Sequence, residues 1–253
     1  MRVVSWNLGF AYRRDEQAQE KAWRYLLDEI DPDIAMLQQA VPPAWARDVR
    51  TVVLGEPPGR WGSAIVTKGL AAEPVGAEGL RRLGADVVCA RIGLPGGELA
   101  LVASVYTKAA PLSAEDRAGV DIEGIRRSAQ EEAWYNDLAY AILKELAADG
   151  RFIVGGDWQT GRLLDRWERH RGAGEEFFAR AERDGWAECL RRFHPEEQRT
   201  LFRGDRGYQF DHMFCDRELG ARLRSCDVVP EPAAQLGLSD RAAIVMELDL
   251  PPV

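Results

Sequence analysis

Polar side chains stand at the ends of apolar, strand-like runs at four widely separated points of the chain. The four strings are Ser5-Trp6-Asn7, Met36-Leu37-Gln38-Gln39, Gly155-Gly156-Asp157-Trp158-Gln159 and Leu238-Ser239-Asp240-Arg241. Strands that deliver amides and carboxylates from distant points to one edge of a sheet form a cradle suited to a hard cation and a phosphate. The strings therefore predict a single polar centre.

The chain is long and apolar enough to bury a large core. Its 253 residues are 46% hydrophobic and 29% charged, so a core can form without disulfides. We expect residues 1–253 to form one domain. The four cysteines, Cys89, Cys189, Cys215 and Cys226, show no CxxC spacing. This spacing favours buried free thiols over a thiolate zinc site or a disulfide framework.

Composition also limits location and partners. No apolar run approaches the roughly 20 residues that a membrane-spanning helix needs. The chain opens with Met1-Arg2-Val3-Val4, which enters a strand without a charged and then apolar leader, so we expect a cytoplasmic protein. Lys plus Arg total 33 against 41 for Asp plus Glu, a net charge of −8. That balance predicts no strong general attraction to nucleic acid.

Short β-rich runs alternate with helical patterns along the chain. Apolar residues recur at helical spacing in 18–30 and 129–148, and residues 160–195 favour short surface helices. Gly and Pro separate the predicted strands, which are 2–7, 34–37, 51–54, 63–67, 86–92, 98–106, 151–155, 208–215, 222–229 and 242–248. This mixture predicts a layered α/β sandwich with two packed sheets and helices outside.

The alternation of side chains along a strand sorts the polar residues by face. Asp157 and Gln159 are two residues apart and are expected to enter the same cleft, while Trp158 points away. Asp211 and His212 are adjacent and face opposite ways by the same rule. We therefore favour a structural or surface role for His212 over a catalytic one.

The order of the motifs resembles the endonuclease/exonuclease/phosphatase superfamily. Between Ser5 and Val245, Trp-Asn is followed by Leu-Gln-Gln, Gly-Ser-Ala-Ile, Val-Tyr, Gly-Asp-Trp-Gln, Phe-Asp-His and Ser-Asp-Arg. Pancreatic-type DNases, abasic-site nucleases, sphingomyelinases and inositol-phosphate phosphatases belong to this superfamily. The resemblance implies a four-layered, DNase-like α/β sandwich with two mixed β-sheets packed face to face, and hydrolysis of a phosphate ester.

The resemblance also places a divalent cation. It implies that Asn7 and the residue at 39, helped by Asp240, hold Mg²⁺ or Mn²⁺. Gln39 stands where the superfamily has glutamate, so this position keeps a coordinating oxygen but lacks the negative charge. We therefore expect weak metal affinity.

Five further positions carry implied catalytic roles. Asp157 would orient or deprotonate the attacking water, and Tyr106 matches the tyrosine of the abasic-site nucleases. Gln159, one methylene longer than the superfamily's asparagine, would donate to the phosphate. Asp211 would orient a histidine expected where Arg241 stands. A guanidinium cannot cycle as an acid or base, but it can bind phosphate and form an ion pair with Asp211.

Two functions follow from these positions. The first is a divalent-metal-dependent phosphodiesterase or nuclease, impaired or atypical because of Gln39, Gln159 and Arg241. The second is a catalytically inactive pseudoenzyme whose cleft binds a phosphorylated ligand or a protein partner, since Gln39 and Arg241 both make the cleft less anionic. A small phosphoester, RNA and DNA all remain open as substrates, and the oligomeric state is not defined by the sequence.

Aromatic residues in the segment 162–206 offer a further possibility. This segment is expected to form part of the rim of the cleft. Its aromatic residues can stack on bases or anchor surface helices to the core, and we favour the second role. They are Trp167, Trp186, Phe193 and Phe202.

Overall fold

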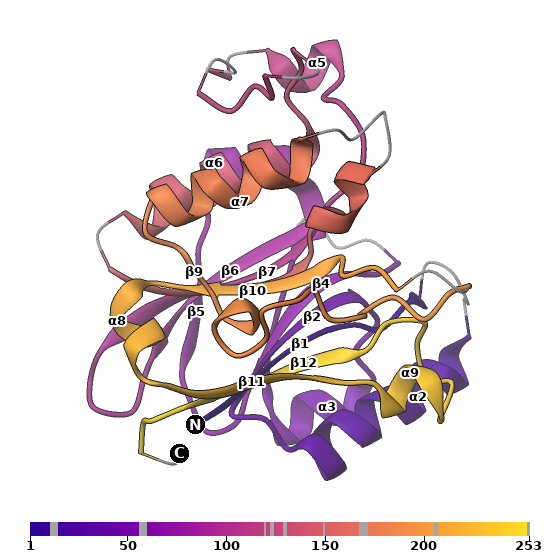
Figure 1. Cartoon of the computed structure of the whole chain (residues 1–253). Helices are drawn as coiled ribbons and strands as arrows, with labels where there is room; N and C mark the ends of the chain where they lie inside the picture. Colours follow the sequence, from indigo (N-terminus) through magenta and orange to yellow (C-terminus); the bar gives the residue numbers. More distant parts are fainter. Residues whose placement is uncertain are drawn as a thin grey trace.

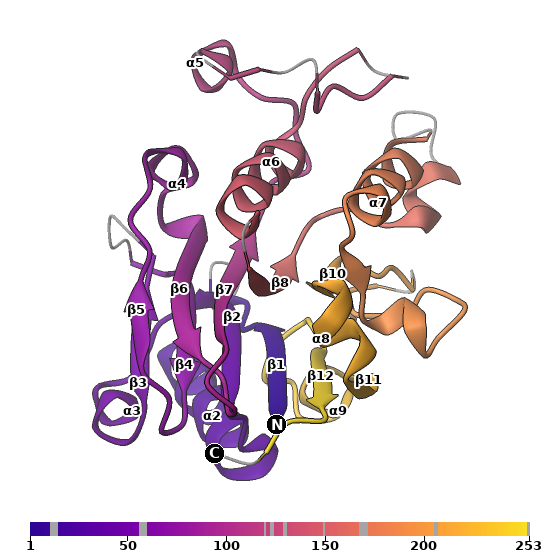
Figure 2. The ribbon, with the colours of Figure 1, turned by 90° about the vertical axis from the view of Figure 1, so that its left-hand side faces the viewer.

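Two mixed sheets pack face to face, with helices on both outer sides (Figures 1 and 2). The computed structural model describes residues 1–10, 15–55, 60–118, 120–121, 124–128, 131–148, 150–166, 172–204 and 207–251. The predicted α/β sandwich is therefore confirmed. That residues 1–253 form one domain stays a prediction.

The first sheet brings the ends of the two earliest strands together. Its strand order is β11-β12-β1-β2-β4-β3, and the β1–β2 pair is parallel. Because parallel strands end at the same edge, Asn7 and Gln39 lie at one edge of this sheet. The strands are β1 (Arg2–Asn7), β2 (Ile34–Ala40), β3 (Thr51–Leu54), β4 (Gly62–Thr67), β11 (Leu223–Val229) and β12 (Ala243–Leu248).

The second sheet brings three further candidate residues to one edge. Its order is β5-β6-β7-β8-β10-β9, and only the β7–β8 pair is parallel among the pairs described. Tyr106 at the end of β7 pairs with Asp157 at the end of β8, and Asp211 at the start of β10 pairs with Asp157 from the other side. The strands are β5 (Ala72–Pro74), β6 (Val87–Gly93), β7 (Leu99–Tyr106), β8 (Arg151–Asp157), β9 (Ala187–Glu188) and β10 (Asp211–Cys215).

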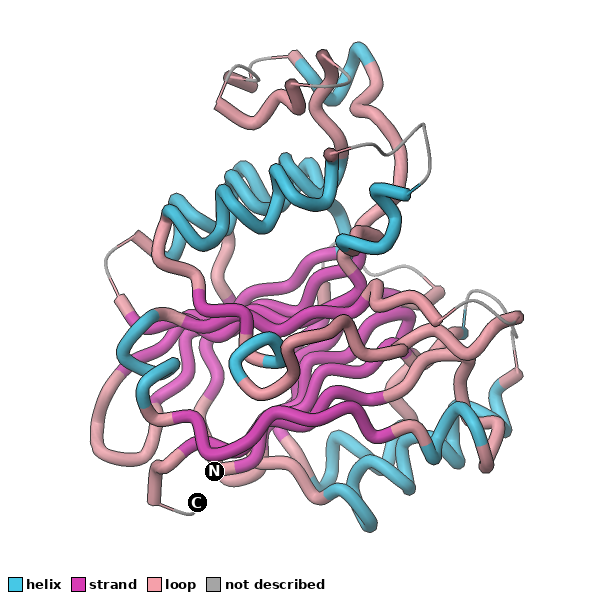
Figure 3. The backbone as a smooth tube through the Cα atoms, in the orientation of Figure 1, coloured by secondary structure: helices cyan, strands magenta, loops and turns pink. Residues whose placement is uncertain are grey.

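Helices cover the outer face of each sheet (Figure 3). The described α-helices are α2 (Glu16–Arg24), α3 (Ala44–Val49), α4 (Glu78–Leu83), α5 (Ala114–Arg117), α6 (Tyr135–Ala147), α7 (Ala173–Arg183), α8 (Arg217–Ala221) and α9 (Glu231–Ala234). α2 buries Ala22 and Trp23 against the first sheet, while α6 and α7 bury Leu143 and Phe177 against the second. Across the described ranges, none of the helices combines the length and apolarity needed to cross a bilayer.

Several predicted boundaries were wrong for local reasons. The helix predicted from residue 129 begins at Tyr135, because the Asp137 carboxylate accepts the N–H of Trp134 at 3.0 Å and caps the helix there. The strand predicted from residue 208 begins at Asp211. Thr200 Oγ1 accepts the backbone N–H groups of Phe210 and Asp211 at 3.0 and 3.2 Å, so these donors are not available to a sheet partner.

The predicted surface helices of 160–195 were only partly right. In the described part of this segment, α7 buries Phe177 and Phe178 in the core between helices and second sheet. Trp186 is also buried in that core, in keeping with the anchoring role, whereas Phe193 is 38% exposed. Trp167 lies outside the described residues.

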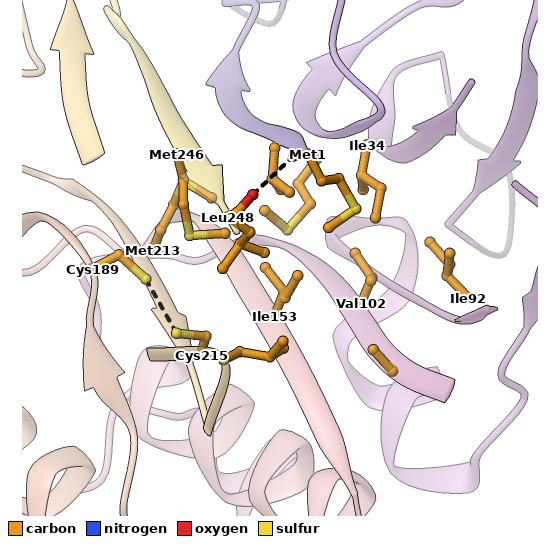
Figure 4. Close-up of a cluster of buried hydrophobic side chains, with 14 of the residues drawn as sticks. Met1, Ile34, Ile92, Val102, Ile153, Cys189, Met213, Cys215, Met246 and Leu248 are labelled. Carbon is orange, nitrogen blue, oxygen red and sulfur yellow. Dashed lines mark hydrogen bonds between the residues drawn. The ribbon is translucent and has the colours of Figure 1, made fainter. Parts of the chain in front are cut away.

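The space between the sheets changes from apolar to polar along the strands. Its centre is filled by apolar side chains such as Ile34, Val102, Ile153 and Met213 (Figure 4). Because residues two apart share a face of a strand, β1, β7 and β8 each contribute to three successive layers. The layers are Val3, Val102 and Ile153, then Ser5, Ser104 and Gly155, and then Asn7, Tyr106 and Asp157. The candidate site is therefore the outermost layer of the inter-sheet space.

The four cysteines are buried and free, as predicted. Cys189 and Cys215 lie in the inter-sheet core with their Sγ atoms 3.6 Å apart (Figure 4). Burial raises the pKa of Cys89 to about 12. Such a thiol packs as a small apolar group.

Candidate functional site

Side chains from both sheets meet at the end of the inter-sheet space. Asn7 Nδ2 donates to Asp157 Oδ2 at 2.9 Å and so joins β1 of the first sheet to β8 of the second. Asp157 is completely buried, and Asn7 and Asp211 are each 2% exposed. The strings that contain Asn7 and Asp157 thus reach one polar centre, and Asp211 on β10 lies beside Asp157 in it.

Arg241 completes this centre from the segment that precedes β12. Its guanidinium lies 2.7 Å from Asp157 Oδ2 and 3.1 Å from Asp211 Oδ2. Trp6 Nε1 donates to the backbone carbonyl of Arg241 at 3.0 Å, and the Arg241 N–H donates to Ser239 Oγ at 3.1 Å. Sequence analysis had paired Arg241 with Asp211 alone. The structure shows that it bridges both carboxylates.

The charges around Arg241 keep it protonated. Burial alone lowers the pKa of a guanidinium, but the carboxylates of Asp157, Asp211 and Asp240 outweigh that effect and raise the Arg241 pKa above its ordinary value. The Arg241 guanidinium lies over the aromatic ring of Phe210, with its central carbon 5.2 Å from the ring centroid. Arg241 is therefore a fixed cation in the centre.

Asp157 is held by hydrogen bonds and an ion pair at both of its carboxylate oxygens. Besides Asn7 and Arg241, Oδ2 accepts a hydrogen bond from Gln159 Nε2 at 2.9 Å, and Oδ1 accepts one from the Gln159 N–H at 3.3 Å. Burial raises the pKa of Asp157 to about 7, helped by Asp211 and opposed by Arg241 and Asn7. A carboxyl group that titrates near neutral pH is suited to take up and release a proton.

We predict that Asp157 makes stability fall as the pH rises. Its folded pKa of about 7 lies above the unfolded value of about 3.9. The folded state therefore binds this proton more tightly, and the resulting stabilisation is lost as the pH rises from about 4 through 7. Urea unfolding from pH 5 to pH 8 measures the effect. The wild type should lose stability relative to Asp157→Asn over this interval, and a constant difference would contradict the shift.

Gln39 lies in a β-bulge at the end of β2. Leu37 pairs with Ala64 and Ala40 with Gly62, so two residues of β2 oppose one residue of β4. Gln39 adopts a φ of 49°, in the left-handed region that is uncommon for residues other than glycine. Its Oε1 atom is buried and accepts no hydrogen bond within the described residues.

The other predicted metal ligands lie at the end of β1. Asn7 Oδ1 accepts the N–H of Gly9 at 2.9 Å. A Cβ atom built on Gly9 would lie 3.4 Å from Asp240 Oδ1, which places this carboxylate beside the turn after Asn7. Gly9 has a φ of 69°, in the left-handed region, and this backbone conformation favours glycine.

The donor set fits a hard divalent cation by atom type but carries little charge. Asn7, Gln39 and Asp240 offer oxygen atoms, the ligand type that Mg²⁺ and Mn²⁺ prefer. The Gln39 Oε1 atom accepts no hydrogen bond from the described residues, so its lone pairs are available to a cation. Only Asp240 is charged, and the described ranges contain no group of three His, Cys, Asp or Glu residues able to hold a metal ion.

Tyr106 forms the wall of the site on the side of β7. Its ring packs edge-on against Trp61, with centroids 5.7 Å apart. Burial and the charge of Asp157 raise the Tyr106 pKa, and a hydrogen bond with Gln39 opposes the rise. The hydroxyl therefore remains protonated at neutral pH and is available as a donor.

His212 faces away from this centre. It is completely buried, with Nε2 2.9 Å from the carbonyl oxygen of Thr160 and Nδ1 2.9 Å from Gln209 Nε2. Its ring packs 4.9 Å from that of Phe178. This placement agrees with the structural role expected from the strand alternation.

Sequence analysis missed the side chains that hold the strand ends together. Ser239 Oγ donates to the Asn7 carbonyl at 2.7 Å. From α2, Gln19 Nε2 donates to the Leu8 carbonyl at 2.9 Å, and Gln19 Oε1 accepts the Val41 N–H at 3.2 Å, which ties the ends of β1 and β2. The signal was a polar residue on the apolar face of a predicted helix.

Comparisons with known proteins add a family and a fold. The family model described as "Endonuclease/Exonuclease/phosphatase family" matches residues 4–240. No curated protein sequence matches the chain. Among solved structures, the 3′-5′ exonuclease NExo from Neisseria meningitidis is 18% identical with a TM-score of 0.72, and the match covers 98% of this chain and 100% of that one.

Two abasic-site (AP) endonucleases share the same fold. The enzyme from Archaeoglobus fulgidus is 17% identical with a TM-score of 0.66, over 99% of this chain and 100% of that one. The enzyme LMAP from Leishmania major is 16% identical with a TM-score of 0.65, over 99% of this chain and 88% of that one. At these identities the likeness concerns the arrangement of strands and helices.

Proposed function

Because the chain belongs to the endonuclease/exonuclease/phosphatase family, we propose that it is a divalent-metal-dependent phosphodiesterase or nuclease with a low or atypical activity. The observation that carries this proposal is the meeting of Asn7, Asp211 and Arg241 around the buried Asp157 where the strand ends converge; burial also raises the Asp157 pKa to about 7. A group with this pKa is matched to proton transfer at neutral pH.

In the proposed reaction, water attacks the phosphorus atom of a phosphate ester. Asp157 accepts a proton from the water as the new P–O bond forms, and the bond to the leaving oxygen breaks as that oxygen takes up a proton from solvent water; Asp157 then returns its proton to the solvent. Arg241 stabilises the negative charge on the phosphoryl oxygens. Tyr106 and Gln159 donate hydrogen bonds at the rim, and Asp211 holds the Arg241 guanidinium.

Asn7, Gln39 and Asp240 are the residues that would hold Mg²⁺ or Mn²⁺. Such an ion supplies a Lewis acid that polarises a phosphoryl oxygen. Because Gln39 and Asn7 are neutral amides, Asp240 provides the charge of this ligand set. We therefore expect weak affinity and a slow reaction.

The bridging position of Arg241 favours a second candidate function. A guanidinium that already pairs with Asp157 and Asp211 offsets part of the negative charge that would otherwise attract a cation. The same group recognises phosphate by paired hydrogen bonds. A non-catalytic protein that binds a phosphorylated ligand or a protein partner is the alternative.

Metal titration and hydrolysis together decide between the two. We expect wild-type protein to bind Mn²⁺ weakly in calorimetry, with a dissociation constant of about 10⁻⁴–10⁻³ M, as sites with few charges do. Asp240→Ala should abolish binding, and Asp48→Ala, at an exposed site, should leave it unchanged. Hydrolysis of bis(p-nitrophenyl) phosphate should require the metal. If the protein shows no binding and no hydrolysis at millimolar Mn²⁺, the enzymatic proposal is wrong.

The substrate is the least defined part of the proposal. The solved structures that share the fold include a 3′-5′ exonuclease and AP endonucleases, so a nucleic acid is the first polymer to test. The net charge of −8 favours a small phosphoester or a single strand over non-specific duplex binding.

A further inference from the structure

A buried polar layer lies directly beneath the candidate site. It consists of Ser5, Gln38 and Ser104, which are at most 1% exposed, together with Gly155. A Cβ atom on Gly155 would lie 2.6 Å from Met36 Cε and 3.0 Å from Ser5 Cβ, so glycine is needed to leave room for this layer. Gln38 and Ser104 make side-chain hydrogen bonds at this depth, whereas Ser5 Oγ has no partner within the described residues.

Gln38 links the two sheets within this layer. Its Nε2 atom donates to Ser104 Oγ on β7 at 3.0 Å and to the Met36 carbonyl at 3.1 Å. Ser104 Oγ in turn donates to the Leu37 carbonyl at 2.7 Å. The amide and the hydroxyl therefore fix the backbone of β2 immediately before its bulge.

The backbone of Gln38 is held as well. Its carbonyl accepts the N–H of Leu8 at 2.9 Å, which continues the parallel pairing of β1 and β2 past Asn7. The next residue, Gln39, takes the left-handed conformation with a φ of 49°. A glutamine persists in that conformation only when the surroundings hold it there.

We propose that Gln38 is a positioning residue. Its buried amide, clamped to Ser104 of the opposite sheet, sets the bulge and thereby aims the Gln39 side chain into the site beside Tyr106. The inference rests on the proposed function only for the role of Gln39 as a metal ligand. The conformational part stands on the hydrogen bonds alone.

Gln38→Leu is the informative variant. Leucine keeps most of the volume, and the Gln38 Oε1 atom that it removes is buried and accepts no hydrogen bond from the described residues. Ser104 Oγ keeps the Leu37 carbonyl as its acceptor. We therefore expect a folded protein with a melting temperature within about 5 °C of the wild type. The backbone ¹³C shifts of residue 39 should move away from their left-handed values.

Metal binding supplies the second readout. Gln39→Glu should bind Mn²⁺ more tightly than wild type, because it adds a negative charge to the ligand set. Adding Gln38→Leu to this variant should weaken Mn²⁺ binding by about 10–100-fold, as loss of a residue that orients a ligand does. Met36→Leu changes the packing of the same strand without removing a side-chain hydrogen bond, so it should leave both readouts unchanged.

The outcomes separate the inference from the proposed function. Unchanged shifts at residue 39 in Gln38→Leu overturn the positioning role, whatever happens to stability. Failure of every variant to bind Mn²⁺ removes the metal site, but the shifts still decide what Gln38 does. If Gln38→Leu does not fold, Ser104→Ala removes the other half of the clamp and should shift the same resonances.

Discussion

The Arg241→Met variant should unfold with a free energy about 3–5 kcal/mol lower than that of the wild type at pH 8. Removing one member of a buried ion pair leaves its partners without compensation. Here the guanidinium is the shared counter-ion of two buried carboxylates, Asp157 and Asp211. Methionine retains much of the arginine side-chain volume, so the loss reports mainly on charge. Urea unfolding followed by circular dichroism measures it.

The pH dependence and a surface control make this prediction specific. The penalty should shrink below pH 7, because Asp157, whose pKa is raised to about 7, then becomes neutral. Arg222→Met removes the pair that Arg222 forms with Glu98 at 2.5 Å, where both side chains are about one third exposed, and should change stability little. Equal losses of unfolding free energy in the two variants would show that the buried ion pairs stabilise the protein no more than the exposed pair does.

The double variant Gln39→Glu/Arg241→His should hydrolyse bis(p-nitrophenyl) phosphate about 10²–10⁴ times faster than the wild type with saturating Mn²⁺. Glutamate adds charge to the metal ligands, and a histidine held by Asp211 can act as an acid or base near neutral pH. The size of the increase is the usual contribution of general acid–base catalysis. Initial rates at several metal concentrations separate tighter binding from faster chemistry.

A matched double variant isolates the acid–base contribution. Gln39→Glu/Arg241→Lys has the same metal ligands and keeps a permanent cation at position 241, so its rate should rise far less. Hydrolysis that appears only with histidine at 241 would identify the wild type as a disabled descendant of a hydrolase. A double variant no faster than the wild type would mean that these two positions do not limit the reaction.

Together, these predictions describe a site in which one residue has two opposing effects. Arg241 stabilises the folded chain by pairing with Asp157 and Asp211, and the same pairing occupies the carboxylates that hydrolysis would use. The amides of Asn7 and Gln39, the proposed metal ligands, carry no charge. The site is therefore assembled through ion pairs and hydrogen bonds of its own residues, and we expect its affinity for a metal ion to be weak.

Much of the fold was predictable because its signals are local. Strand alternation placed Asp157 opposite Trp158 and Asp211 opposite His212, and the structure agrees: Asp157 meets Asn7 between the sheets, while Trp158 is buried under the helices. Turn residues separated the strands at about the right places. Boundaries failed where side-chain hydrogen bonds to the backbone intervened, from Asp137 before α6 and from Thr200 before β10.

The sequence by itself determined the two-sheet architecture, the family and the set of polar residues that converge, because each depends on side-chain periodicity or on motif order. Only the tertiary structure decided what those residues do to one another. The bridge from Arg241 to both carboxylates, the bulge that turns Gln39 and the raised pKa of Asp157 arise from contacts between segments far apart in the chain. Such contacts depend on distances of a few ångströms and on the exclusion of water, and neither is written in the order of the residues.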